Sequence, residues 1–260
     1  MNNEPSTMNY LGTWTLFKKE CWRFLKVYNQ TLVAPVITSL LFLAVFHLAM
    51  GGHVTQVAGV RFELFMASGL IIMAVVQQSF ANSSSSLVMC KVIGMIVDIL
   101  MPPFSAAEIM IAMLGACIVR GILVAIISAL AISFFIPLEV ANWGAVIYFL
   151  LASALMLGLL GLLAGIIAES FDHMSAITSY VITPLAFLSG TFYSIENLPP
   201  AWQMAAHFNP FFYMIDGFRF GMTGHSDTNI WLGAAVIFAA IIALGAVCYK
   251  LINKGYRLKS

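Results

Sequence analysis

The side chains that could do chemistry are few and widely scattered in this chain. Its four cysteines and five histidines follow no spacing typical of a metal site, and the cysteines suggest no disulfide framework. No Gly-Lys-Ser or Gly-Lys-Thr tripeptide occurs, so the usual loop that holds the phosphates of ATP is missing. These patterns predict no catalytic set, no metal site and no cofactor bound by this chain, and they indicate that it is not an enzyme.

Arg120 stands out because it lies within a long apolar run. It is about 11 residues into the run from Ile109 to Leu138, which corresponds to roughly 17 Å along a helix. If this run crosses a membrane, an arginine at that depth faces protein or a water-filled cavity. Arg120 is therefore a candidate for a substrate path, where it would meet an anionic headgroup. In the structural alternatives it snorkels, or it pairs with Glu169 or Asp172.

The composition determines which elements can position these residues. Of the 260 residues, 61% are hydrophobic and 9% are charged, and the mean hydropathy is +0.95. Soluble domains carry about 25% charged residues, so a soluble enzyme and a disordered chain are both excluded. The net charge of +1 gives no electrostatic footprint for nucleic acid. The composition leaves a multi-span membrane protein, which we interpret as a single domain over residues 1–260.

Six stretches with almost no Asp, Glu, Lys or Arg are long enough to cross the roughly 30 Å core of a bilayer. Backbone groups in lipid must be satisfied within the segment, which favours helices over strands. The sequence therefore predicts an all-α membrane protein with six transmembrane helices, over residues 32–50, 62–82, 108–135, 143–167, 174–193 and 230–250. Within the fourth, Gly158, Gly161 and Gly165 predict a smooth strip for close helix packing.

Lysine and arginine fall mainly on one side of these helices. With both termini inside, nine of the twelve lie on the cytoplasmic side, Arg61 and Arg219 lie outside, and Arg120 lies within a span. Cytoplasmic loops of membrane proteins carry an excess of Lys and Arg. The distribution therefore predicts that both termini are cytoplasmic, in agreement with an even number of spans.

The segment before the first span, residues 10–28, has the pattern of an amphipathic helix. Aromatic and apolar side chains gather on one side of a helical projection, whereas Lys19, Glu20, Arg23 and Lys26 lie roughly opposite. This pattern is typical of a helix lying on the cytoplasmic surface of the membrane. The alternative is a positively flanked lead-in to the first span.

The loop over residues 83–107 is unusually apolar for a cytoplasmic segment. We expect a short amphipathic helix from about Val92 to Met101, stopped by the two prolines that follow. Ser105 and Glu108 have the spacing of a capping box at the start of the third span. Apolar residues on such a loop need a partner, which is either the protein's own helices or another protein.

The segment 194–229 is expected outside the membrane, although it is rich in aromatic residues. Two proline signals interrupt it and predict a pair of short helices that dip back into the outer leaflet. Asp216 and Arg219 are three residues apart on a predicted helix, a spacing compatible with an ion pair. The alternative is an aromatic belt at the membrane surface without a further role.

Two motifs resemble sequences of the bacterial ABC type-2 exporter permeases. The first is carried by Gly94, Ile96, Asp98, Leu100-Met101-Pro102-Pro103, Ser105 and Glu108. The second is carried by Phe187-Leu188-Ser189-Gly190-Thr191-Phe192-Tyr193, Leu198-Pro199, Asn209-Pro210-Phe211, Tyr213, Ile215-Asp216-Gly217 and Arg219. The predicted spans and the cationic first helix also fit, so the resemblance covers essentially the whole chain.

The resemblance implies a membrane subunit that works in a complex. Such a subunit pairs with a second copy of itself or a related permease in the bacterial inner membrane. Two copies of a cytoplasmic ABC ATPase subunit, which carry the ATP and Mg, drive the pair. By the same resemblance, residues 10–28 correspond to an elbow helix, the loop around 91–105 to a coupling helix and residues 194–220 to a re-entrant outer hairpin.

The resemblance also implies roles for particular residues. The candidates for coupling to the ATPase are Lys91, Gly94, Asp98, Pro102, Pro103 and Glu108. The candidates for the outer gate and hairpin are Gly190, Phe192, Tyr193, Pro199, Asn209, Pro210, Asp216 and Arg219.

The resulting functional prediction is the permease subunit of an exporter that moves a drug, lipid or glycan of hydrophobic or amphipathic character. An ion-gradient-driven secondary transporter or channel is the alternative, and it would favour acidic residues near the middle of the membrane. Here every Asp and Glu falls at the end of a predicted span or in a loop. A membrane-embedded enzyme would need a convergent catalytic set, for which the sequence offers no candidate.

Overall fold

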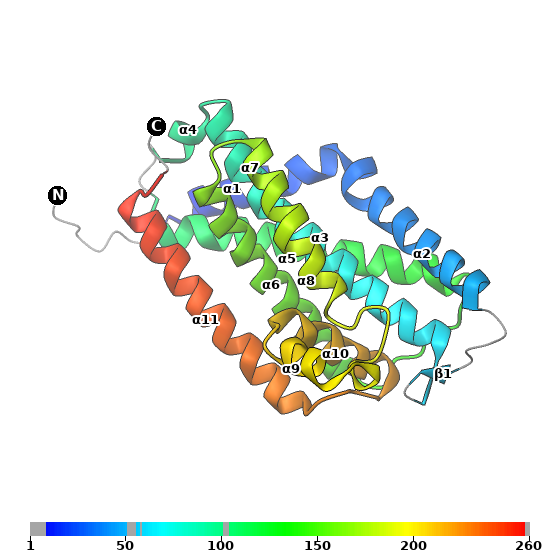
Figure 1. Ribbon diagram of the computed structural model, residues 1–260. Helices are drawn as coiled ribbons and strands as arrows, with labels where there is room; N and C mark the ends of the chain where they lie inside the picture. The colour runs from blue at the N-terminus through cyan, green and yellow to red at the C-terminus, as the bar shows by residue number, and fades with distance from the viewer. Residues whose placement is uncertain (1–8, 51–55, 58, 101–103, 258–260) are drawn as a thin grey trace.

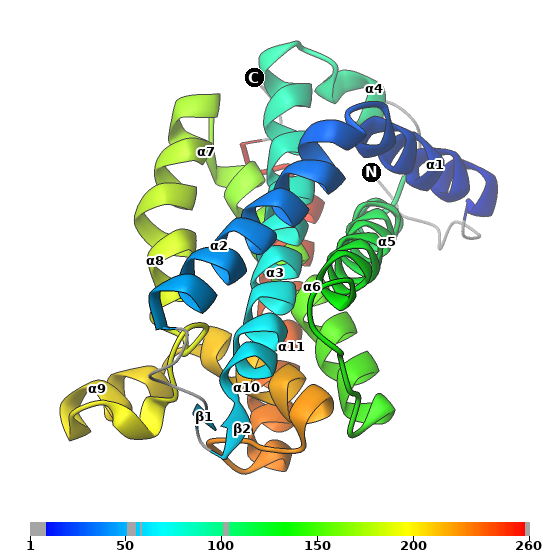
Figure 2. The same ribbon diagram turned by 90° about the vertical axis from the view of Figure 1, so that its right-hand side faces the viewer.

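Helices make up most of the computed structural model, which describes residues 9–50, 56–57, 59–100 and 104–257 (Figures 1 and 2). The α-helices are α1 (Tyr10–Lys26), α2 (Ala34–Met50), α3 (Phe62–Val92), α4 (Ile96–Leu100), α5 (Ala106–Ser133), α6 (Trp143–Ile167), α7 (Phe171–Ile177), α8 (Thr183–Phe187), α9 (Pro200–His207), α10 (Pro210–Thr223) and α11 (Ile230–Lys254). The π-helical turns η1 (Asn29–Val33) and η2 (Thr178–Ile182), the 3-10 turn η3 (Ile195–Asn197) and the antiparallel strands β1 (Gln56–Val57) and β2 (Val60–Arg61) complete the described elements.

Five helices are long and apolar enough to cross a membrane. They are the segment Asn29–Ala49, α3, α5, α6 and α11. The predicted span 174–193 is not among them, because the helical stretch from Phe171 ends at Phe187 and the chain turns at Gly190, where φ is 74°. Five of the six predicted spans are thus confirmed as helices of spanning length, and a crossing near 171–187 stays a prediction.

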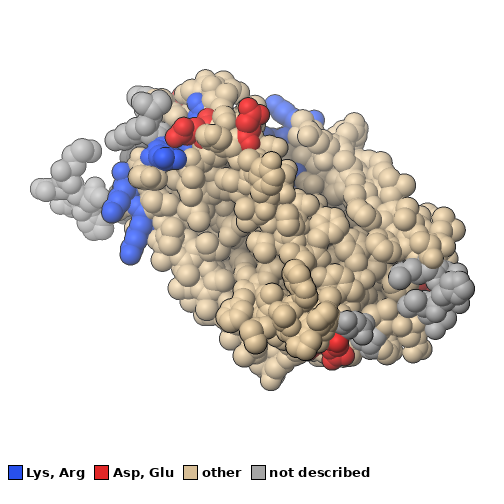
Figure 3. Space-filling model, in the orientation of Figure 1, with Lys and Arg blue, Asp and Glu red and all other residues tan. Residues whose placement is uncertain are grey.

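The two ends of the bundle differ in the elements and the charges that they carry. We call them the α4 end, where α1, α4 and the last turn of α11 lie, and the α9 end, where the β1–β2 hairpin, α9 and α10 lie (Figure 1). Both ends of the described chain are at the α4 end. Lysine and arginine gather at the α4 end, and the face of the flank turned to the viewer in Figure 3 shows almost no charged residues among those described.

Helix α3 is longer than its predicted span, and this changes the expected loop. It has 31 residues, so it is roughly 45 Å long and exceeds a hydrocarbon core of about 30 Å. The predicted short helix of this loop is present as α4, but its expected start at about Val92 is wrong, because α3 continues to Val92 and α4 begins only at Ile96. Its expected end at Met101 lies outside the described residues. Gly94, with φ of 80°, makes the turn between α3 and α4 in a conformation that favours glycine.

A wide helical turn precedes a proline at two places. Pro35 follows η1 and Pro184 follows η2, each by two residues. In both turns the backbone N–H bonds the carbonyl five residues earlier, from Ala34 to Asn29 and from Thr183 to Thr178. A proline cannot donate to the carbonyl four residues before it, and its ring clashes with that carbonyl, so the wider turn relieves the clash without breaking the helix.

The glycine strip of α6 lets α3 approach very closely. A Cβ added to Gly161 would lie 2.3 Å from the carbonyl oxygen of Phe80, and one added to Gly165 would lie 2.9 Å from the Cβ of Leu87. Gly158 takes the same role against Cys117 of α5. The predicted packing strip is therefore confirmed, and it places α3 at the centre of the bundle with most of its side chains buried.

Candidate functional site

Glu108 joins the starts of two helices at the α4 end. Ser105 caps α5, and the carboxylate of Glu108 accepts from the backbone N–H and the hydroxyl of Ser105, so the predicted capping box is confirmed. The same carboxylate accepts from the backbone N–H of Asn9, the N-cap residue of α1. Glu108 is buried and serves the fold by fixing the first helix to the third predicted span.

Lys91 holds the end of a helix in the same region. Its ammonium donates to the carbonyl oxygens of Ile166 and, at 3.1 Å, of Ala168, where α6 ends. Arg257 donates to the next carbonyl, that of Ile167, at 3.2 Å and lies 3.5 Å from the carboxylate of Glu169. Positive groups stabilise the carbonyl end of a helix, so both cations fasten α6.

Of the remaining coupling candidates, two are exposed and two lie outside the described residues. Gly94 and Asp98 are exposed on the turn and on α4, and large apolar side chains are exposed beside them. Pro102 and Pro103 lie outside the residues that the structure describes. Of the four coupling candidates that the structure describes, Gly94 and Asp98 are the two exposed on a surface that a partner could contact.

At the α9 end, Arg219 and Asp216 are both buried but bind different groups. Arg219 donates to the carbonyl of Gly190 at 2.7 Å, and its guanidinium carbon lies 3.7 Å from the centre of the Phe65 ring. Asp216 accepts from the backbone N–H of Asp227 at 2.8 Å and from the hydroxyl of Thr228 at 2.8 Å. The expected ion pair between Asp216 and Arg219 does not form, because each side chain bonds a separate loop, and the Nε of Arg219 has no hydrogen-bond partner among the described residues.

Burial also acts on the ionisation of this carboxylate. It raises the pKa of Asp216 above its ordinary value, and the hydrogen bonds from Asp227 and Thr228 oppose that shift. Asp227 in turn accepts from the backbone N–H of Ile195 at 3.0 Å. The carboxylates of α10 and of the following loop therefore fix the loop geometry at this end.

The other outer-gate candidates hold the turn between α8 and α10. Phe192 stacks on Phe187 and on Phe46 of α2, with ring centres 5.3 Å apart in both pairs. Asn209 caps α10 and donates from its amide to the hydroxyl of Ser189 at 2.8 Å. The positions of the other three are as follows: Tyr193 donates to the carbonyl of Leu188, Pro199 is the exposed N-cap of α9, and Pro210 opens α10.

A buried polar network connects α1, α3 and α5. Arg120 is 5% exposed, and its guanidinium donates to the side-chain oxygens of Asn82, at 3.3 Å, and of Gln78. Arg23 of α1 donates to the backbone carbonyl of Asn82 at 2.8 Å and to its side-chain oxygen at 3.1 Å. Arg120 therefore bonds two neutral amides rather than Glu169 or Asp172.

Glu20 completes this network, in contrast to its expected place among the cations of the polar face. It is 1% exposed, lies 3.0 Å from the Nε of Arg23 and accepts from the hydroxyl of Ser86 at 2.9 Å. The prediction for the polar face of the first helix is thus wrong for Glu20 and Arg23, which point at α3. The helix itself, Tyr10–Lys26, is confirmed, and its place on a membrane surface stays a prediction.

A small polar cleft adjoins the network on the side of α2. Helix α2 lies across α3 and beside α8 (Figure 2). Residues of these three helices line a cavity of about 200 Å³. Its polar lining is Thr38, Ser39, Gln77 and Gln78, and its apolar lining includes Phe42, Leu70, Met73 and Phe187. Gln78 lines the cleft and its side-chain oxygen also accepts a hydrogen bond from Arg120. The guanidinium of Arg120 is therefore separated from the cleft by the side chain of Gln78.

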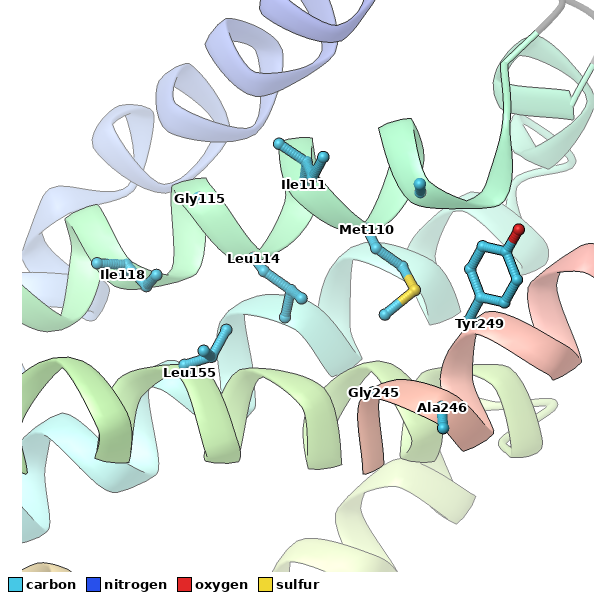
Figure 4. Close-up of a pocket in the computed structure, with 10 residues that line it drawn as sticks. Met110, Ile111, Leu114, Gly115, Ile118, Leu155, Gly245, Ala246 and Tyr249 are labelled. Atoms are coloured by element: carbon cyan, nitrogen blue, oxygen red, sulfur yellow. The ribbon is translucent and has the colours of Figure 1, made fainter. Parts of the chain in front are cut away.

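A second cavity, between α5, α6 and α11, is apolar. It measures about 640 Å³, and Tyr249 brings the only polar side chain to a lining that includes Met110, Leu114 and Leu155 (Figure 4). Specific ligand sites combine apolar walls with a few polar groups that fix orientation. This groove has almost none, so the polar cleft is the better candidate for recognition. Within the described ranges, no three His, Cys, Asp or Glu side chains come together to hold a metal ion.

The sequence interpretation missed several members of these sites. Asn82, Gln77 and Gln78 were overlooked although they are polar residues inside the apolar run from Leu64 to Cys90, which is the signal that could have found them. Glu20 had no such signal, because its neighbours in the helix are cations. The outer aromatic cluster was predicted only in part, since Phe42 and Phe46 come from a distant span.

Together, five apolar helices of spanning length, charged groups at one end and a polar cleft between helices define a multi-pass helical membrane protein. A family model described as ABC-2 type transporter matches residues 12–223. The chain belongs to the ABC-2 type transporter family and is a membrane transport permease.

Relatives of the chain agree with this assignment. The inner membrane transport permease YadH of Escherichia coli strain K12 is 36% identical over 246 residues, which cover 95% of this chain and 96% of that protein. Nodulation protein J of Rhizobium leguminosarum bv. viciae is 32% identical over 116 residues, or 44% of this chain and 45% of that protein. The first similarity extends over nearly both whole chains, and the second covers less than half of each.

Proposed function

We propose that this permease is the membrane subunit of an ATP-driven exporter and that a separate ATPase subunit, which binds the ATP and Mg, docks at the α4 end. One observation supports this most directly. Helix α3 extends about 15 Å beyond the length that a bilayer core requires, and it ends in the Gly94 turn and α4. Exposed Ile93, Met95 and Val97 surround Asp98 there, and an exposed apolar patch of this kind suits docking of another protein.

The proposed orientation places the α4 end in the cytoplasm and both termini with it, in a bacterial inner membrane. The gathering of lysine and arginine at that end supports it. Both ends of the described chain lie at the α4 end, which requires an even number of crossings. We therefore assign the sixth crossing to the helical stretch from Phe171 to Phe187, whose 17 residues correspond to roughly 25 Å.

In the proposed complex, this chain pairs with a second copy of itself or a related permease, and each copy is driven by one ATPase subunit. Helix α1 is the elbow helix on the cytoplasmic surface, and its cations support that placement. Helices α9 and α10 form the re-entrant hairpin of the outer side. The cleft between α2, α3 and α8 is the proposed path for an amphipathic substrate, because it combines polar and apolar walls.

The test of this proposal is a charge reversal on the coupling surface. Asp98 is exposed, so Asp98→Lys should leave folding and insertion unchanged. In the proposed complex Asp98 faces a positive group of the ATPase, so the variant would oppose like charges, which cost several kcal/mol across an interface. We therefore expect the amount of ATPase that co-purifies with the permease to fall at least about ten-fold. Transport by the reconstituted complex should fall with it.

The matched control is Glu139→Lys, which reverses an exposed carboxylate beyond the far end of α5. It should co-purify with the ATPase as the unchanged protein does. Equal ATPase recovery from both variants would contradict the docking surface. A purified chain that moves substrate in liposomes on an ion gradient alone would favour the secondary transporter instead.

A further inference from the structure

The polar network between α1, α3 and α5 carries more positive than negative charge. It contains two guanidinium groups, Arg23 and Arg120, and one carboxylate, Glu20. That carboxylate is engaged with Arg23 at 3.0 Å and with Ser86. In the part of the chain that the structure describes, no carboxylate lies within 4.0 Å of Arg120.

Arg120 is also incompletely bonded. Only 5% of its surface is exposed, and its Nε has no hydrogen-bond partner among the described residues. A buried charge without an opposite charge is unfavourable by several kcal/mol, so such a group marks a place where an anion would be stabilised. Its two acceptors, the side-chain oxygens of Asn82 and Gln78, are neutral.

If Phe62 marks the boundary of the hydrocarbon core on the α9 side, the network lies at the depth of the headgroup region of the other leaflet. Asn82 is 20 residues from the start of α3 at Phe62, which corresponds to about 30 Å, the thickness of the hydrocarbon core. The ten residues that follow reach towards the α4 end. With the boundary at Phe62, Asn82 and the arginines bonded to it lie near the boundary of the core on the α4 side.

The adjoining cleft has a polarity gradient in the same direction. Gln77 and Gln78 lie on the α4 side of the cleft, and Leu70 lies two turns further towards the α9 end of α3. At about 200 Å³ the cleft is smaller than the roughly 300–1,000 Å³ of ordinary small-molecule sites. It fits the region where headgroup and chain join in an amphipathic molecule, with the remaining chain in the bilayer against the exposed apolar face of α2.

We propose that Arg120, together with Arg23, Asn82 and Gln78, binds the anionic headgroup of a lipid-like amphipath in the leaflet on the α4 side. The planar guanidinium can donate two parallel bonds to a phosphate or carboxylate, and Gln78 can release its oxygen to admit the ligand. This inference rests on the proposed function in one respect: if the chain exports, an anionic amphipath is the class of substrate that enters here.

The experiment compares lipids on the purified full-length permease in neutral detergent, without any ATPase. The probes are dioleoyl phosphatidylglycerol, which is anionic, and dioleoyl phosphatidylcholine, which is not; bound lipid is counted by native mass spectrometry. We expect phosphatidylglycerol to bind at least about ten-fold more tightly. Equal binding of the two lipids would overturn the proposal, and this comparison depends on no variant.

Variants then test whether Arg120 causes the preference for phosphatidylglycerol. Arg120→Gln should bring the two lipids to within about two-fold, whereas Arg120→Lys should retain part of the preference because it keeps the charge but loses the fork. Arg61→Gln removes an exposed arginine at the α9 end and is the matched control, expected to behave as the unchanged protein. A preference that persists in a folded Arg120→Gln would assign it elsewhere and overturn the proposal.

A competition experiment with a soluble phosphate compound shows whether the site binds a lipid headgroup or a free phosphate. Glycerol 3-phosphate, which carries the phosphate without chains, should compete only weakly with phosphatidylglycerol. If it binds as tightly as the lipid, the site recognises a free phosphate and the assignment to an amphipath is wrong. Because no ATPase is present, failure of the lipid preference leaves the coupling proposal standing, and failure of ATPase docking leaves this binding measurement unaffected.

Discussion

At the scale of single residues, Gly161 is the glycine of α6 that comes closest to a backbone atom of α3. A Cβ there would meet the carbonyl oxygen of Phe80 at 2.3 Å, and a backbone oxygen cannot rotate away as a side chain can. We expect Gly161→Ala to lower the free energy of unfolding by about 1–3 kcal/mol, the usual effect of overpacking. The thermal midpoint of the purified protein in detergent measures this.

Gly245→Ala is the matched control within another spanning helix. A Cβ at Gly245 meets nothing within 4 Å, and alanine favours a helix by up to about 1 kcal/mol over glycine. Its midpoint should be unchanged or slightly raised. If both substitutions lower the midpoint equally, the close contact with Phe80 is not what makes Gly161 important.

The sequence identified Arg120 as a special residue but could not identify its partners. An arginine inside an apolar run is visible without a structure, whereas its bonds to Asn82 and Gln78 join positions 38 and 42 residues apart. The helical projection failed for Glu20 for a related reason. A helical projection separates polar from apolar faces of one helix. It contains no information about a polar group such as Ser86 on the neighbouring helix.

At the scale of elements, Glu108 connects the first turn of α1 to the first turn of α5. Glu108→Ala would remove an acceptor from the backbone N–H of Asn9 and of Ser105, and the loss of such caps costs about 0.5–2 kcal/mol. We expect faster hydrogen exchange over residues 10–13, measured by mass spectrometry. Glu139→Ala is the control, since that carboxylate is exposed. Unchanged exchange in the Glu108 variant would show that α1 is held by its other contacts.

The elements themselves were largely predictable, and their ends were not. Five spanning helices could be predicted because a long apolar run can be recognised from its own residues, without knowing which helices it packs against. Helix α3 exceeds its predicted end at 82 because Ser83, Ser84 and Ser86, which suggested a loop, are buried within the fold. The stretch from 174 to 193 became shorter, since the turn at Gly190 is set by Arg219 from α10.

At the scale of the whole molecule, the charge distribution predicts which end faces the cytoplasm. In a background without Cys21, Cys90, Cys117 and Cys248, we would place single cysteines at Asp98, on α4, and at Glu196, near α9. Both residues are exposed. A membrane-impermeant maleimide should label position 196 in intact cells and position 98 only after permeabilisation. The reverse pattern would invert the proposed orientation.

The unbroken course of α3 has a mechanical consequence. Gly161 of α6 touches this helix at Phe80, with 12 residues on the Val92 side and 18 on the Phe62 side. If α3 tilts as a stiff rod about this contact, a displacement of about 1 Å at Val92 becomes roughly 1.5 Å at Phe62, in the opposite direction. A small displacement of the Val92 end of α3, caused by a partner at one face of the membrane, would then produce a larger displacement of the Phe62 end in the opposite direction.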